Sequence, residues 1–216
     1  MNKNPYLSAA LQENAFTLTL EMQQQLDTYL TLLQKWNKVF NLTAIRDSRD
    51  MVYLHIIDSL AISPFLHGTR MLDVGSGAGL PGLPLAITHP EQQWTLLDKG
   101  EKKTRFMTQA VVELGLKNIT IVNARCEDFH SELGFDSIVS RAFSALSMML
   151  EKTKHLIAAN GIFVAMKGAQ MVTELEELPE GFSVLAVQPI KITGINVERH
   201  VICVRLGTDI VSYLKG

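Results

Sequence analysis

From Arg70 onward, short apolar runs alternate with amphipathic stretches, and this alternation constrains the fold more than any other feature of the chain. The apolar runs predict strands at 70–74, 93–97, 119–123, 136–140 and 162–166, and the stretches between them predict helices at about 82–89, 102–114 and 145–158. Strands that alternate with helices are typical of an open parallel sheet with helices on both faces. The sequence therefore predicts an α/β fold.

Two further apolar runs, 183–189 and 200–206, complete the predicted sheet. The segment that joins them, KITGINVE, is too short to hold a crossover helix. The last strand must therefore run antiparallel to its neighbour. We expect a seven-stranded, mostly parallel sheet with one antiparallel strand.

The residues before the sheet predict two helices. Apolar residues recur at helical spacing over 21–40, and Asp50 is a candidate N-cap for a second helix that reaches about Leu66. We therefore interpret residues 1–66 as an N-terminal helical extension packed on a core of residues 67–216. The two parts are expected to form a single structural domain.

The two cysteines, Cys126 and Cys203, provide neither a disulfide framework nor a zinc cluster of usual spacing, which suits a reducing compartment. The first residues lack the basic and apolar regions of a signal peptide, and no window approaches 18 uninterrupted apolar residues. We expect a cytoplasmic protein that binds no membrane and no metal, and that is a monomer.

A glycine loop follows the first predicted strand in the segment MLDVGSGAGLPG. Asp73 precedes the loop, and Gly75, Gly77 and Gly79 would let the chain turn tightly and let a ligand approach the backbone. Asp98 ends the next predicted strand, where its carboxylate could accept the ribose hydroxyls of a nucleotide. The alternative is a glycine turn with a purely structural role.

Two cofactor classes compete for this loop. A dinucleotide fingerprint requires a third glycine where this chain has Leu80. A strand that ends in Asp-Val-Gly and continues as GxGxG instead resembles motif I of the Rossmann-like, class I methyltransferases that use S-adenosylmethionine (SAM). The sequence therefore favours SAM as the cofactor.

The residues that could support chemistry narrow the target. Ser140-Arg141-Ala142-Phe143 stands where amino-directed methyltransferases carry an Asp/Asn-Pro-Pro-aromatic motif, and neither cysteine lies in a usual nucleophile loop. These absences favour a target atom that is already a nucleophile, such as a ring nitrogen with a free lone pair. Methylating guanine N7 removes no proton before attack, so positioning and desolvation could suffice.

The net charge of −2 argues at first against a nucleic-acid partner. However, four of the negative charges lie in one stretch, at Glu174, Glu176, Glu177 and Glu180. Ligands bind beyond the carboxyl ends of the strands in such folds, and cations follow the strands there, at Lys99, Arg125, Arg141, Lys167 and Arg199. Several cations acting together can bind a phosphate backbone, although any one of them could belong to an ordinary solvated face.

The chain resembles the RsmG (GidB) family, whose members methylate N7 of a guanine in bacterial 16S rRNA with SAM. The resemblance runs from about Trp36 to Arg205 and includes the segments WNKVFNLTAI, HIIDSL, DVGSGAGLPGLPLAI, LLDKGEKKTRF, SRAF, MKG and ERHVICV. It implies cofactor contacts at Gly75, Leu80, Cys126, Glu127 and Arg141. The pattern of the glycine loop and the next strand adds Asp73, Gly77, Gly79 and Asp98 to the expected cofactor-binding residues. Family members commonly have a small or aliphatic residue in place of Cys126 and a serine in place of Lys99.

On this interpretation Arg141 borders both cofactor and target and is the candidate catalytic residue, while Arg125, Lys167 and Arg199 contact 16S rRNA or the small subunit. Phe143 is a candidate for stacking on the guanine, with a core role as the alternative. His55 and Asp58 lie one helical turn apart; we expect an internal hydrogen bond that ties the N-terminal helices to the sheet rather than half of a metal site. A methyltransferase of small molecules or proteins, and a non-enzymatic RNA-binding assembly factor, remain as alternatives.

Overall fold

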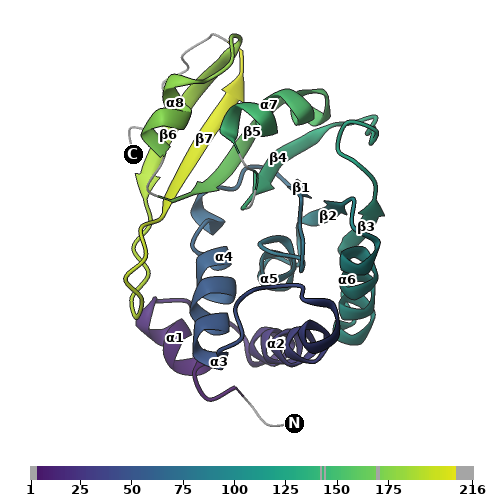
Figure 1. Cartoon of the computed structure of the whole chain (residues 1–216), viewed down its shortest axis with the longest axis vertical. Coiled ribbons are helices and arrows are strands. Elements are labelled where there is room, and N and C mark those ends of the chain that lie inside the picture. Colours follow the sequence, from purple (N-terminus) through teal and green to yellow (C-terminus); the bar gives the residue numbers. More distant parts are fainter. Residues whose placement is uncertain (1–3, 142, 144, 169–170, 208–216) are drawn as a thin grey trace.

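The computed structural model describes residues 4–207 except 142, 144 and 169–170. Its centre is a seven-stranded sheet in the order β3-β2-β1-β4-β5-β7-β6 (Figure 1). The strands are β1 (Arg70–Val74), β2 (Gln93–Asp98), β3 (Ile119–Asn123), β4 (Phe135–Ser140), β5 (Ile157–Lys167), β6 (Phe182–Pro189) and β7 (His200–Leu206). Strand β7 is antiparallel to both of its neighbours, whereas the pairs from β3 to β5 are parallel. The predicted sheet, with its one antiparallel strand, is confirmed.

Helices cover the sheet in two groups, each with its own apolar cluster. The first cluster joins α1 (Leu7–Glu13), α2 (Leu20–Phe40), α5 (Gly82–Thr88) and α6 (Glu101–Leu114) to the sheet. The second joins α7 (Leu146–Thr153) to the sheet, with Leu175 of α8 (Met171–Glu176) packed against it. The prediction of helices on both faces is confirmed. The large side chains that are fully buried include Tyr29, Trp94 and Phe106.

The boundary between α7 and β5 differs from the prediction. We expected a helix over 145–158, but α7 ends at Thr153 and, after a 3-10 turn at Lys154–Leu156, β5 begins at Ile157. Ile157 pairs with Phe135, and a register shift follows before the regular pairing resumes. Pairing with β4 thus overrides the local helical preference of the two alanines that follow Ile157.

The segment expected to form one helix from Asp50 to Leu66 is instead built from short pieces. These are α3 (Ser48–Met51), a π-helix (Val52–Ile57), α4 (Asp58–Leu60) and a 3-10 helix (Ser63–Phe65). The N-cap is Asp47, whose Oδ1 accepts hydrogen bonds from the amides of Arg49 and Asp50, so the prediction of Asp50 as the cap is wrong. Asp50 lies in the first turn, where a carboxylate suits the helix dipole.

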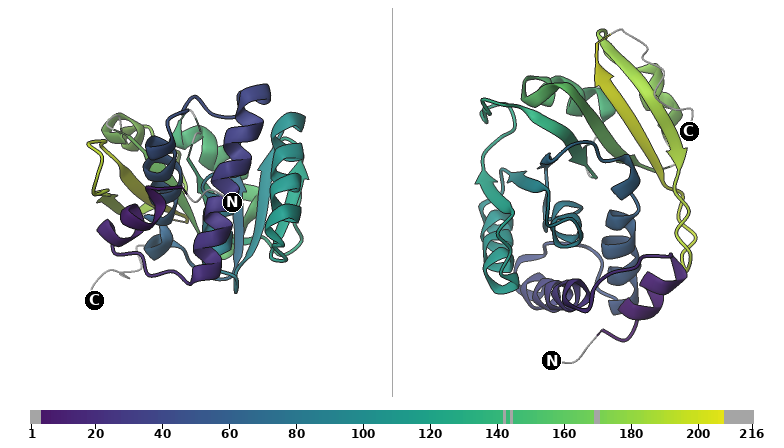
Figure 2. Two further views of the ribbon diagram at one scale, coloured as in Figure 1. Left: turned by 90° about the horizontal axis from the view of Figure 1, so that it is seen from below. Right: turned by 180° about the vertical axis from the view of Figure 1, so that it is seen from behind.

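The connection between β6 and β7 reaches from the sheet to the N-terminal helices (Figures 1 and 2). Asn14 and Thr193 exchange two hydrogen bonds, of 3.1 and 2.8 Å, and Arg49 Nη2 donates to the carbonyl oxygen of Gly194 at 2.6 Å. Gly194 has a φ of +99°, and a Cβ there would lie 2.4 Å from the ring of Tyr53. The hairpin therefore holds the extension against the core from the side opposite α6. No helix in the described ranges is long and apolar enough to span a membrane.

Candidate active site

The glycine loop connects β1 to α5 and is fixed to the end of β2. Gly75, Gly77 and Gly79 have φ values of +72°, +59° and +81°, which glycine adopts without strain. The amides of Gly75 and Ser76 both donate to the carbonyl oxygen of Leu97, at 2.8 and 3.2 Å. The hydroxyl of Tyr29 in α2 donates to the carbonyl oxygen of Ala78 at 2.8 Å. The N-terminal extension thus supports the loop directly.

The three glycines have different surroundings. A Cβ built on Gly75 meets nothing within 4 Å, and one on Gly77 meets only the oxygen of Gly75, at 3.9 Å. A Cβ on Gly79 would lie 2.3 Å from Leu83. The first two glycines therefore border open space in which a ligand can approach the backbone, while the third permits close packing against α5.

Asp98 lies at the edge of this open space, as the sequence predicts. Its Oδ2 accepts from the amide of Gly77 at 2.9 Å, and its Oδ1 accepts from the amide of Gly100 at 2.8 Å. Lys103 Nζ is 3.4 Å from Oδ2. Oδ1 keeps a second lone pair that accepts from no described residue, and Lys103 is a long, weak donor to Oδ2. The group is therefore held in place and can still accept a hydroxyl. The loop and the carboxylate together fit an adenosine-type cofactor.

Asp73 lies beneath the loop rather than in the open space. Its side chain is fully buried, Oδ2 accepts from the amide of Gly82 at 2.9 Å, and Oδ1 has no hydrogen-bond partner among the described residues. Burial raises the pKa of this carboxyl to about 7. The sequence analysis placed Asp73 among the cofactor-binding residues. In the structure its buried carboxylate contacts the amide of Gly82, so it fixes the conformation of the loop and does not face the open space.

Cys126 and Glu127 follow β3 and contact each other. The thiol of Cys126 donates to Oε2 of Glu127 at 3.1 Å, while Lys152 of α7 contacts Oε1 at 2.6 Å. Burial, followed by the Glu127 hydrogen bond, raises the pKa of Cys126 to about 11, so this cysteine is a protonated thiol and not a nucleophile. The hydrogen bond from Lys152 lowers the pKa of Glu127 to about 2.

Leu80 lies in the glycine loop and is buried. Its amide donates to the carbonyl oxygen of Ser76.

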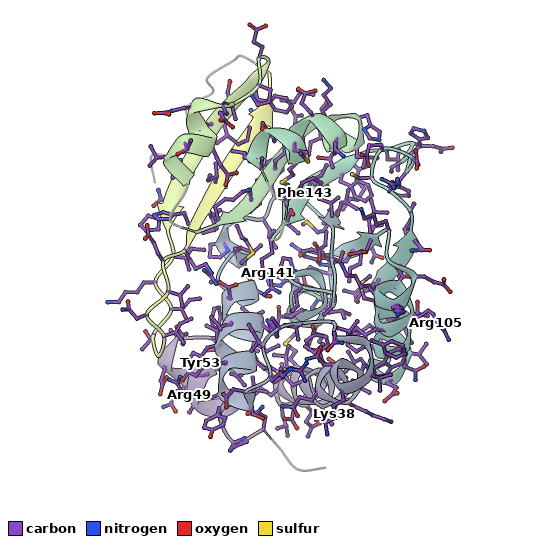
Figure 3. The ribbon with its side chains drawn as sticks, in the orientation of Figure 1. Lys38, Arg49, Tyr53, Arg105, Arg141 and Phe143 are labelled. Atoms are coloured by element: carbon purple, nitrogen blue, oxygen red, sulfur yellow. The ribbon has the colours of Figure 1, made fainter. Side chains whose placement is uncertain are left out.

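Arg141 follows β4 and faces the N-terminal helices, near the middle of the molecule in Figure 3. Its Nη1 donates to the carbonyl oxygen of Leu54 at 2.9 Å and lies 3.8 Å from Oδ2 of Asp58. The other oxygen of Asp58 accepts from Nε of Arg199 at 3.1 Å. Burial raises the pKa of Asp58, and the two guanidinium groups oppose this shift. One buried carboxylate therefore joins two of the predicted site cations.

His55 completes the connection to the N-terminal extension. Its Nε2 lies 3.0 Å from the hydroxyl of Thr43, and its Nδ1 lies 3.4 Å from Nη1 of Arg141. Burial, followed by the nearby charge of Arg141, lowers the pKa of His55 to about 3, so the ring is neutral. The expected tie between the N-terminal helices and the sheet is confirmed. No three His, Cys, Asp or Glu side chains within the described part of the chain are grouped as a metal site requires.

The remaining cations separate into two kinds. Lys167 is almost fully buried; its Nζ lies 2.6 Å from Oε2 of Glu174 and donates to the carbonyl oxygen of Phe143 at 3.2 Å. Lys99 and Arg125 are exposed and make no ion pair with any described residue. Glu174, which belongs to the acidic stretch and lies in α8, therefore compensates one of the predicted rRNA-binding cations.

Phe143 is partly buried and packs against the second apolar cluster, and it is labelled above Arg141 in Figure 3. Ala142, which the predicted SRAF motif includes, lies outside the described residues. Sequence reasoning did not identify Tyr29 as a support for the loop, nor Asp58 as the partner of both arginines. The HIIDSL segment was the available signal for Asp58, but its partners are distant in sequence.

Comparisons with known proteins identify the family of this chain. The family model described as "rRNA small subunit methyltransferase G" matches residues 22–202. The chain is 48% identical to the Ribosomal RNA small subunit methyltransferase G of Chromobacterium violaceum, over 91% of this chain and 94% of that protein. It is 45% identical to the protein of that name from Klebsiella pneumoniae, over 92% and 96%.

Solved structures show the same fold at low sequence identity. A SAM-dependent methyltransferase from Aquifex aeolicus has a TM-score of 0.57 and 18% identity, and the match covers 72% of this chain and 92% of that one. TYW2 of P. horikoshii, solved with MeSAdo, has a TM-score of 0.54 and 14% identity, with 71% and 62% covered.

Proposed function

This chain belongs to the rRNA small subunit methyltransferase G family, and we propose that it transfers a methyl group from SAM to N7 of a guanine in 16S rRNA. Family membership makes it a SAM-dependent methyltransferase of small-subunit rRNA. The guanine N7 target comes from the resemblance to RsmG, and the chemistry of the site supports it.

The observation that carries the N7 assignment is the state of the titratable groups around the glycine loop and beside Arg141. His55 is neutral and buried, Cys126 is a protonated thiol, and Asp98 is bound by two backbone amides. None of these three groups is arranged as a general base. When bound, SAM supplies an electrophilic methyl group on a sulfonium. A ring nitrogen with a free lone pair attacks such a group without first losing a proton, so it matches a site that provides positioning.

The cofactor roles follow from this arrangement. Gly75 and Gly77 let the cofactor approach the backbone, Asp98 accepts the ribose hydroxyls, and Cys126 with Glu127 borders the adenine. Leu80 and Gly79 hold the loop against α5, and Asp73 fixes it through Gly82. These groups orient SAM and exclude water from one side of the methyl group.

Arg141 is the residue that we place between cofactor and target. Its charge is partly compensated by Asp58, and its hydrogen bond to Leu54 fixes the guanidinium in one orientation. A fixed cation there attracts the polynucleotide and can donate hydrogen bonds to O6 of the target guanine. Arg141 therefore acts by orienting the reactants and not by proton transfer.

For the rRNA backbone, we assign the direct phosphate contacts to Arg125 and Arg199. Arg125 is exposed, and Arg199 is about a quarter exposed while it contacts Asp58. Lys167, predicted to contact phosphate, instead supports the segment after β4 through Phe143 and Glu174. We propose that the protein works as a monomer in the cytoplasm on 16S rRNA or the small subunit, with residues 1–66 as an extension of the core.

A labelling experiment tests this function. The protein is incubated with radiolabelled SAM, with small ribosomal subunits that lack the modification, and with a cell extract. Label recovered in 16S rRNA supports it. Label in small metabolites or in protein would instead indicate the alternative methyltransferase class, and subunit binding without transfer would indicate an assembly factor. The variant Asp98→Ala provides the control for label that does not come from this site.

A further inference from the structure

An open groove of about 390 Å³ lies between α2, α6 and β3, outside the site described above. Its lining includes Trp36, Arg105, Thr108, Gln109, Ile121 and Asn123. None of these residues belongs to the glycine loop or contacts Asp58. Figure 3 labels Arg105 on α6, at the side of the molecule away from Arg141.

An aromatic ring forms one wall of the groove. Trp36 is partly exposed and is fixed by two neighbouring rings, with its centroid 5.7 Å from that of Phe106 and 5.2 Å from that of Phe40. Such support holds the indole in place while part of its surface remains open. A supported, partly exposed indole is a suitable platform for stacking a nucleobase.

Charged and polar groups lie around this ring. Arg105 is exposed and has no ion pair or hydrogen bond to a described residue, and Lys102 lies one turn before it on the same face of α6. Gln109 donates to Glu113 at 2.8 Å, which leaves its carbonyl oxygen as an acceptor. Asn123 Nδ2 donates to the carbonyl oxygen of Asp98 at 3.1 Å, which leaves its Oδ1 as an acceptor.

We propose that this groove binds an unpaired nucleotide of the rRNA substrate. The base stacks on Trp36, Gln109 and Asn123 accept hydrogen bonds from its edge, and Arg105 with Lys102 binds the phosphate. The combination of an aromatic ring, edge acceptors and uncompensated cations matches single-stranded RNA, which is bound by stacking and backbone charge together.

The groove is connected to the cofactor site through β3. Asn123 is the register partner of Asp98, so a nucleotide in the groove would lie beside the edge at which the cofactor ribose is expected. A second anchor there would orient the RNA relative to the target guanine. This inference rests on the proposed function, because it takes rRNA as the substrate.

Tryptophan fluorescence provides a direct test that does not depend on catalysis. The chain has two tryptophans, and Trp94 is 1% exposed, so an added ligand should affect the emission of Trp36. The probe is a short single-stranded oligoribonucleotide of mixed sequence. We expect saturable quenching in the wild type that is lost in Trp36→Phe. Unchanged emission in the wild type, or equal quenching in Trp36→Phe, would overturn the proposal.

A charge-reversal pair provides the functional test. Arg105→Glu changes the groove, whereas Lys117→Glu makes the same change at an exposed position beyond the other end of α6. With modification-free small subunits, Arg105→Glu should raise KM about tenfold, while its kcat, SAM affinity and melting temperature stay near those of Lys117→Glu. Equal KM values for the two variants would contradict the groove assignment, and so would a KM effect explained by lost SAM binding.

The two proposals can fail separately. If the wild type transfers no label to small subunits but Trp36 is still quenched by the oligonucleotide, the proposed function fails, while the groove is still shown to bind RNA. If transfer proceeds normally and both groove variants, Trp36→Phe and Arg105→Glu, behave like the wild type, the proposed function stands and the groove assignment fails. A ribosomal protein as the occupant would appear as a KM effect of Arg105→Glu without quenching by RNA, which would contradict the nucleotide assignment.

Discussion

Asp58 and Arg199 are separated by 141 residues in sequence, yet Oδ1 of the carboxylate accepts a hydrogen bond from Nε of the guanidinium at 3.1 Å. Oδ2 of the same carboxylate lies 3.8 Å from Arg141. Asp58 follows directly on a π-helix, a distortion that is frequent at functional sites. The N-terminal extension therefore fixes two arginines that the sheet alone would leave uncompensated.

Replacing Asp58 by Asn keeps the shape of this side chain but removes the charge that holds both arginines. We expect the free energy of unfolding to fall by about 2 kcal/mol, because a buried, charge-assisted network is broken. Methyl transfer should fall further than the folded fraction explains. Thermal melts and transfer assays with modification-free subunits measure both quantities.

Arg199→Ala tests the other end of this contact. It should weaken rRNA binding but leave SAM affinity nearly intact. Equal loss of rRNA binding and SAM affinity would remove Arg199 from the rRNA contacts.

Asp98→Ala should lower SAM affinity at least tenfold, since the carboxylate fixes the amides of Gly77 and Gly100 and is the expected ribose acceptor. Calorimetric titration beside a thermal melt separates binding from unfolding. Asp128→Ala is a matched control, because that carboxylate is exposed and has no side-chain partner among described residues. SAM affinity that is the same in both variants would take Asp98 out of the site.

Arg125→Ala should weaken rRNA binding without changing the melting temperature, because the side chain is exposed and unpaired within the described residues. One lost phosphate contact should also reduce the slope of log K against log salt by about 1. Binding of the small subunit measured at several salt concentrations gives both values. An unchanged salt slope would show that Arg125 contacts no phosphate.

His55 makes stability depend on pH in a defined direction. Its pKa is about 3 in the folded chain and 6.5 when unperturbed, so between these values the unfolded chain binds more protons. Stability is therefore lost as pH falls below about 6.5, and the wild type should lose about 2 kcal/mol more than His55→Gln between pH 7.5 and pH 5. Denaturant titrations at the two pH values measure this difference. Parallel losses in both proteins would mean that the pKa of His55 is the same in the folded and unfolded chains, which would contradict the lowered value.

Local patterns were sufficient to predict the sheet and most of its strands, because most strands are short apolar runs bounded by turns. The first residues of β5 are the exception, since they were predicted as helix and pair with β4 instead. The antiparallel direction of β7 followed from the length of one connection. The extension was less predictable: the pattern around Val52 indicates a helix, but two residues of the π-helix there contact partners distant in sequence, Tyr53 at Gly194 and His55 at Thr43. Those partners lie outside any local window.

The same distinction applies to the site. Asp98 and the glycine loop lie together as predicted, because the ends of adjacent parallel strands meet at one edge. The cations also follow the strands, but the sequence could not indicate which of them were compensated. Lys167 is paired with Glu174 and Arg199 with Asp58, and both contacts depend on how separate elements pack.

The identity of the methylated atom is the most direct test of the proposed function. Small subunits that lack the modification are incubated with the protein and SAM, and their 16S rRNA is digested to nucleosides for mass spectrometry. We predict 7-methylguanosine at a single position with the wild type and, at SAM concentrations near the wild-type Kd, markedly less of it with Asp98→Ala. A methyl group on another atom or base, or wild-type levels of product with Asp98→Ala, would contradict it.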